Sequence, residues 1–234
     1  MKRKLFVMLT IILVGTSLFT IAQTKVNVNV KGFTGVENSI SANVNISQSS
    51  EYVVEVIAPQ SIIDDLNIYV EEGILKLKKK DSLFKWSSGD NKVVINIWAP
   101  SYNSVAMNGS GSIEAKTPIV SKDFVIKING SGNVKIGSLE VVSLVVKSNG
   151  SGDVFVAGSK VLESVEYGIN GSGNIEASQL SAKKASAQIN GSGDIKVWAT
   201  VEFNARVNGS GNIDLKGNPT IDAKMHGSGR LKRG

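Results

Sequence analysis

The sequence predicts an all-β protein, and within that class a right-handed parallel β-helix-like solenoid with an N-terminal β capping region. Three observations favour this fold. Val, Ile, Asn and Ser are abundant and only 4 prolines occur, which is typical of β-rich chains. No segment has a sustained apolar stripe at helical spacing. A motif, Asn-Gly-Ser-Gly followed by a polar residue, recurs every 18 to 21 residues. It starts at Asn108, Asn129, Asn149, Asn170, Asn190 and Asn208, and a degenerate copy starts at His226.

The residues after each motif alternate between apolar and polar, as in a half-buried strand. The fifth and seventh positions after the Asn are almost all apolar, whereas the sixth is mostly charged. The fifth position is occupied by Ile113, Val134, Val154, Ile175, Ile195, Ile213 and Leu231. The sixth is occupied by Glu114, Lys135, Phe155, Glu176, Lys196, Asp214 and Lys232. Apart from Phe155, the charges alternate in sign, which predicts coils stacked in register about 4.8 Å apart with cross-strand ion pairs.

The alternative is an antiparallel β-hairpin meander or barrel, because Asn-Gly between alternating runs is also a signal for a tight hairpin. Stacked coils require a constant period and columns in register, whereas hairpins require neither, so the solenoid is favoured. Parallel coils are expected to wind right-handed.

The motif is interpreted as a structural corner. Its glycines permit a positive φ or a close approach of neighbouring coils, and its asparagines are expected to stack as an amide ladder. The last copy departs from the pattern at His226, Arg230 and Arg233, which indicates a polar end to the stack.

Three segments follow from these patterns. Residues 1–22 have the basic start, apolar run and small residues of a secretory signal, and no transmembrane segment is expected after its removal. Residues 24–106 lack the motif but contain strand-like runs, with a turn at Gly73, and form a cap or the first coils. Residues 107–234 form the repeat solenoid. The protein is therefore expected to be exported to the periplasm, the outer surface or the extracellular space.

Charge and cysteine content restrict the function classes. The formal net charge is +6, and without Lys2, Arg3 and Lys4 it is +3, with the remaining charges scattered. Such a balance does not indicate nucleic-acid binding. No cysteine is present, so neither disulfides nor a lipoprotein-type anchor are expected.

Several stretches together resemble a known family. They are "FTGVENSISANVNISQSSEYVVEV", "VEEGILKLKKK", "VVINIWAPSYNSVAMNGSGSI" and the recurring "NGSG" followed by Asn or Asp and then Ile or Val, and they span about Phe33 to Leu215. The chain is similar to the bacterial exported family of unknown function described as "putative auto-transporter adhesin, head GIN domain". The resemblance implies a β-helix-like fold, a cell-envelope location and adhesion.

Candidate chemistry at the corners is weak. Gly150–Asp153 and Gly191–Asp194 are similar to calcium-binding glycine-rich repeats, but the acidic position varies between coils and the companion corner is missing. Glycoside hydrolysis needs two closely spaced carboxyls, and Asp153 and Asp194 are expected about 10 Å apart. We therefore predict no catalytic, cofactor or metal residues.

The sequence predicts instead a non-catalytic envelope protein, an adhesin or binding module that recognises a glycan, a lipid or a protein on a solenoid face. The alternative is a polysaccharide lyase or hydrolase on the same scaffold. The candidate contact aromatics are Phe155, Trp86, Trp98 and Trp198, and core or cap packing is the competing role of each.

Overall fold

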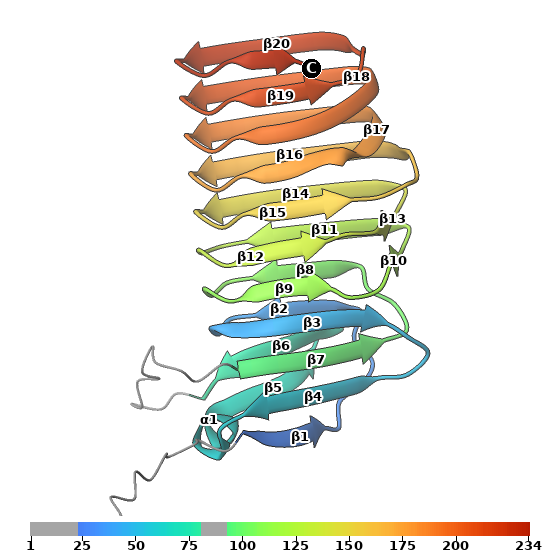
Figure 1. Cartoon of the computed structure of the whole chain (residues 1–234), viewed down its shortest axis with the longest axis vertical. Coiled ribbons are helices and arrows are strands. Elements are labelled where there is room, and N and C mark those ends of the chain that lie inside the picture. The colour runs from blue at the N-terminus through green and yellow to red at the C-terminus, as the bar shows by residue number, and fades with distance from the viewer. Residues whose placement is uncertain (1–22, 81–92) are drawn as a thin grey trace, which may run out of the picture.

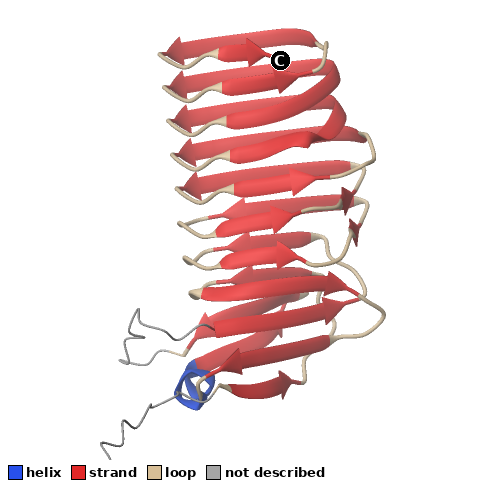
Figure 2. Cartoon of the chain, in the orientation of Figure 1, coloured by secondary structure: helices blue, strands red, loops and turns tan. Residues whose placement is uncertain are grey.

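The chain folds into a stack of parallel β-coils, as the computed structural model in Figure 1 shows. The structure describes residues 23–80 and 93–234. Each coil has one strand that enters the Asn-Gly-Ser-Gly corner and one that leaves it, so the stack has two broad faces, here called the upstream face and the downstream face. The predicted parallel solenoid is confirmed. Within these described residues, helix is confined to one short element near the capped end of the stack (Figure 2).

Most strands belong to one face only. The upstream face contains β2 (Gly35–Asn38), β8 (Ser104–Met107), β11 (Asp123–Ile128), β14 (Ser143–Gly150), β16 (Leu162–Gly171) and β20 (Thr220–Gly227). The downstream face contains β3 (Ala42–Gln48), β9 (Ser112–Ala115), β12 (Asn133–Ile136), β15 (Val154–Ala157), β19 (Ile213–Lys216) and β21 (Leu231–Arg233). Two long strands, β17 (Ile175–Gly191) and β18 (Ile195–Gly209), contribute to both faces.

The strand register places the corners of successive coils directly on one another. Asn149 pairs with Asn170, Asn170 with Asn190, and Asn190 with Asn208, all in parallel. The antiparallel hairpin alternative is therefore wrong for these corners. The inward columns fill the interior with aliphatic side chains, and Val134, Ile175 and Ile195 are each at most 1% exposed.

The corner glycines act in the two ways that the sequence predicts. The second residue of the motif has a positive φ in the later coils, for example 140° at Gly191. The fourth residue lies against the coil below, because a Cβ built on Gly193 would stand 1.9 Å from the carbonyl oxygen of Gly173. Any side chain at either position would force the coils apart.

The edge opposite the corners changes along the stack. Two short parallel strands, β10 (Ile119–Val120) and β13 (Leu139–Glu140), form a separate two-stranded sheet there. In the later coils β17 and β18 continue across this edge, with irregular register where they cross it.

Residues of the N-terminal region supply both a coil and a cap. Strands β2 and β3 form a coil that lies between β8–β9 on one side and β6 (Ile74–Lys79) with β7 (Val93–Ala99) on the other. Antiparallel pairs then close this end of the stack: β1 (Thr24–Val28) pairs with β4 (Val53–Ala58), β4 with β7, and β5 (Leu66–Glu71) with β6. The helix α1 (Gln60–Asp65) joins β4 to β5.

The corner of this first coil lacks the repeated motif. Ser39 lies next to Asn108 in the stack, and Ile40 and Ala42 take the places of the two glycines. The side chain of buried Asn38 spans the bend, since its Oδ1 accepts from the Ile40 amide at 3.1 Å and its Nδ2 donates to the Ala42 carbonyl at 3.2 Å. A buried amide thus fixes a corner that glycines shape elsewhere.

In the described part of the chain, no helix has the length and hydrophobicity needed to cross a bilayer. The predicted signal, residues 1–22, lies outside the described residues, as does Trp86 within 81–92.

Candidate binding face

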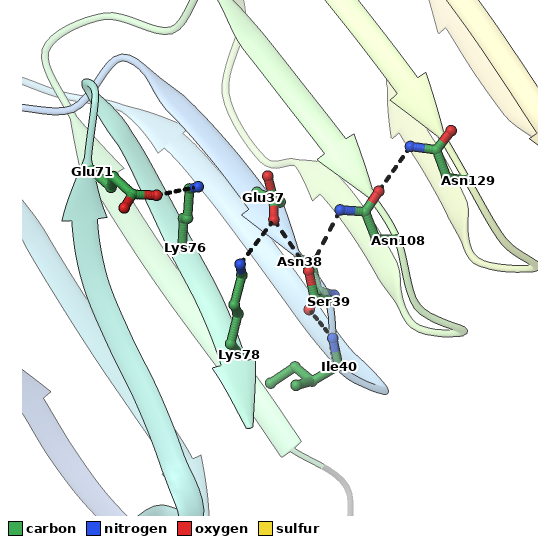
Figure 3. A network of polar contacts seen from close by, with 9 residues as sticks. All are labelled: Glu37, Asn38, Ser39, Ile40, Glu71, Lys76, Lys78, Asn108 and Asn129. Carbon is green, nitrogen blue, oxygen red and sulfur yellow. Dashed lines mark hydrogen bonds and ion pairs between the residues drawn. The ribbon is translucent and has the colours of Figure 1, made fainter. Parts of the chain in front are cut away.

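The asparagines of the corners form a continuous amide ladder along one edge of the stack. In each step an Asn Nδ2 donates to the Oδ1 of the Asn one coil nearer the N-terminus, at 2.8 to 3.0 Å. At the N-terminal end the Asn108 Nδ2 reaches Ser39 Oγ at 3.4 Å (Figure 3). At the other end His226 aligns with Asn208 and replaces the amide. The predicted ladder is confirmed, and its amides hold the corners together.

A second ladder uses the two aspartates that the sequence singles out. Asp153 Oδ1 accepts from the backbone amide and the Nδ2 of Asn174, at 2.8 and 2.9 Å. Asp194 Oδ1 accepts from the corresponding groups of Asn212, at 2.7 and 3.0 Å. The two aspartates lie two coils apart with Asn174 between them, as expected. Both carboxylates therefore have a structural use in the turn.

The downstream face carries the alternating charge column in the predicted register. Lys135 Nζ lies 3.2 Å from Glu114 Oε1, and Lys196 Nζ lies 2.7 Å from Glu176 Oε2. Burial raises the pKa of Glu176, but hydrogen bonds from Lys196 and Ser178 outweigh it, so the pKa lies below its ordinary value. Hydrogen bonding to Glu176 likewise raises the pKa of Lys196. Both groups are thus held in their charged forms.

Phe155 interrupts this column between the two ion pairs. It pairs in register with Lys135 on one side and Glu176 on the other, and each of these charges is bonded away from the ring. The half-buried ring lies in an open hollow of about 390 Å³. The polar residues around the hollow are Asn133, Lys135, Asp153, Asn174 and Glu176. The arrangement is an apolar floor with hydrogen-bonding groups and both signs of charge at its rim.

Two further aromatics lie on the same face. Trp198 is half-buried on β18, where Lys216 Nζ stands 3.7 Å from its ring centroid, so one side of the indole is already in contact with a cation. It lies two coils from Phe155, about 10 Å along the stack. Trp98 is half-buried on β7 in the cap, with Ser47 as its neighbour. Phe155 and Trp198 thus share the face but are separated by two coils and two strand positions, and Trp98 lies at the far end of the face.

The break in the charge column at Phe155 was a signal visible in the sequence. The hollow around Phe155 could not be predicted from the sequence. Its walls come from three coils, and its shape depends on which charged side chains form ion pairs with each other. In the part of the chain that the structure describes, no group of three or more His, Cys, Asp or Glu is placed to hold a metal ion.

The sequence matches the model of a known protein family. Residues 32–219 match the profile of a family described as "putative auto-transporter adhesin, head GIN domain". The comparison with curated proteins gave no match.

Solved structures share the fold over most of the chain. A putative adhesin from Bacteroides fragilis is 29% identical, with 91% of this chain and 97% of that chain covered and a TM-score of 0.83. A putative lipid binding protein from Parabacteroides distasonis is 24% identical, with 91% and 96% covered and a TM-score of 0.74. A putative adhesin from Parabacteroides merdae is 20% identical, with 91% and 96% covered and a TM-score of 0.70. Since the family profile covers most of the sequence, the chain belongs to the family described as "putative auto-transporter adhesin, head GIN domain".

Proposed function

We propose that this protein is an exported, non-catalytic adhesin of the cell envelope that binds a glycan on its downstream face, in the hollow around Phe155. The family and its adhesin-like relatives support an adhesin role and an exported location. The predicted signal at residues 1–22 supports export as well.

The single observation that carries the proposal is the apolar gap in a column of otherwise alternating charges. A phenyl ring on a rigid sheet offers a flat apolar surface for the C–H face of a sugar. At the rim the Oδ1 atoms of Asn133 and Asn174 accept from the backbone amides of Asp153 and Asp194, and their Nδ2 groups keep N–H donors for sugar hydroxyls. Glu176 and Lys135 are already neutralised by partners within the column, so the rim does not impose a net charge on the ligand. A neutral or mixed-charge glycan fits this description better than an acyl chain, which would need a deeper apolar cleft.

The alternative of a polysaccharide lyase or hydrolase receives no support from the corner carboxylates. Asp153 and Asp194 are bonded into the turn ladder, and Asn174 occupies the position between them. A non-catalytic role is the function that these contacts favour.

A glycan array probed with the mature chain tests the proposal, with Phe155→Ala as the diagnostic variant and Val142→Ala, an exposed residue on another edge, as the matched control. Loss of the aromatic floor should weaken retention at least about tenfold, because central aromatic contacts contribute about 2 kcal/mol. The control should bind as the parent chain does. Retention that Phe155→Ala leaves unchanged would place the site elsewhere. Release of reducing or unsaturated sugars would establish an enzyme, and retention only on lipid vesicles or protein would exclude a glycan ligand.

A further inference from the structure

We propose a second binding site, on the upstream face, that takes a carboxylated saccharide through Arg206 and Lys224. It lies on the opposite side of the stack from Phe155 and is independent of the function proposed there. It rests on a hollow, on two stacked cations that form no ion pair within residues 23–80 and 93–234, and on a set of neutral hydrogen-bonding side chains.

The hollow arises from small side chains in the middle of the upstream face. It has a volume of about 310 Å³ and spans β16, β17, β18 and β20. Gly168 stands in the outward column between Lys147 and Gln188, and the nearest atom to a Cβ built there is 3.8 Å away. Ser186 is similarly short in the neighbouring column. Because the side chains at these positions are small or absent, the surface near Arg206 is recessed.

The cations at the upper wall of the hollow are stacked on each other. Arg206 and Lys224 are direct cross-strand neighbours, and like charges in this relation destabilise a sheet. Within the residues that the structure describes, neither lies within ion-pair distance of a carboxylate. The downstream face shows the opposite arrangement, in which Lys196 and Glu176 alternate and pair at 2.7 Å. An anionic ligand would relieve the repulsion on the upstream face.

Two carboxylates also face the hollow, and they do not neutralise this pair. Glu166 is bonded to Lys147 at 3.3 Å, on the far side of Gly168. Asp222 precedes Lys224 by two residues on β20 and pairs in register with Asn204. The four charged side chains that line the hollow sum to zero. Lys147, which lies beside the hollow and is bonded to Glu166, brings the local sum to one positive charge.

The remaining groups favour a saccharide over other anions. Ser186, Gln188 and Asn204 supply hydroxyl and amide groups along the floor, which suit sugar hydroxyls. The Arg206 guanidinium can bind a carboxylate through two parallel hydrogen bonds, and Lys224 adds a point charge beside it. A phosphate-rich polymer would need a longer positive track than two cations provide.

Binding of oligogalacturonides, compared with their methyl esters, tests the proposal by calorimetry on the mature chain. The ester keeps every ring and removes only the charge, so the free acid should bind at least about tenfold more tightly, as hydrogen bonds between charged groups predict. The double variant Arg206→Gln, Lys224→Gln should lose that difference. The control Lys127→Gln, Lys160→Gln removes the same charge from sites outside the hollow and should retain it. Arg206→Lys keeps the charge without the planar fork and should bind with intermediate affinity.

Other outcomes would overturn the proposal. Equal affinity for the acid and the ester, or an equal loss in the control variant, would reduce the effect to general electrostatics. Binding to vesicles with anionic lipid but not to the oligogalacturonide would exclude a saccharide. Phe155→Ala should not change the preference for the acid, so failure of this site and failure of the downstream site are separate results.

Discussion

Gly193→Ala tests the central structural claim, that the corners stack backbone against backbone. A Cβ at Gly193 would stand 1.9 Å from the Gly173 carbonyl oxygen, and contacts of this kind below 3.0 Å are essentially never seen. The two coils must therefore separate locally by at least about 1 Å, since sterically forbidden contacts are relieved by displacement. The hydrogen bonds at risk are Ser192 N to Gly171 O at 2.9 Å, Gly193 N to Gly171 O at 3.3 Å, and Asp194 N to Asn174 Oδ1 at 3.0 Å.

Three such bonds at about 1 kcal/mol each predict a loss of about 3 kcal/mol in the free energy of unfolding. Urea denaturation followed by far-UV circular dichroism measures it. Gly168→Ala is the matched control, because its Cβ would make only ordinary van der Waals contacts on the upstream face, the nearest atom being 3.8 Å away. This control should leave the free energy of unfolding unchanged or raise it by about 0.5 kcal/mol, because alanine reduces the conformational entropy of the unfolded chain. A loss below about 1 kcal/mol for Gly193→Ala would refute the close-stacking argument.

Three further predictions concern stability. Tyr167→Phe should raise the free energy of unfolding by about 1 kcal/mol, because the buried Tyr167 hydroxyl has no hydrogen-bond partner among the residues that the structure describes. Tyr102→Phe should lower it, since that hydroxyl donates to the Ile97 carbonyl at 3.1 Å. Urea midpoints that move in the reverse order would contradict the assignment. Asn170→Ala should cost about 1 kcal/mol by breaking the ladder bonds to Asn149 and from Asn190, and an unchanged thermal midpoint would show that the ladder is not stabilising. Acidification should destabilise the fold below about pH 4.5, because the pKa values of Glu114 and Glu176 in the folded protein lie below the ordinary 4.5. Their contribution to the free energy of unfolding is therefore present above that pH and is lost as the pH falls through the folded-state pKa values. A pH titration of stability should be shallower in Glu176→Gln.

The solenoid could be predicted from the sequence because each coil repeats the same constraints. The corner fixes where glycine and asparagine must stand, and the inward columns must be apolar in every coil. Ile175 and Ile195 therefore occupy equivalent buried positions whose spacing along the chain gives the coil length. The ion pairs at Glu114 and Glu176 follow from the same register.

The first coil and the cap could not be predicted in the same way. The bend at Asn38–Ala42 is held by a buried side-chain amide, so its sequence has no glycine to mark it. The order of coils also departs from chain order, because β2–β3 lies between β6–β7 and β8–β9. Periodicity relates each coil to the next one in the sequence, and it carries no information when the next coil in space comes from elsewhere in the chain.

Both candidate sites lie where the outward-facing side chains depart from favourable cross-strand pairing. An inward residue is constrained by the core and a corner residue by the coil below, but an outward residue only has to tolerate its two cross-strand neighbours. One outward column of the downstream face meets that condition with alternating charges, as Lys196 does with Glu176. Phe155 breaks the series, and on the upstream face Arg206 stacked on Lys224 works against it. Because the scaffold gains nothing from either departure, these are the positions where contact with a ligand would compensate for the lost pairing.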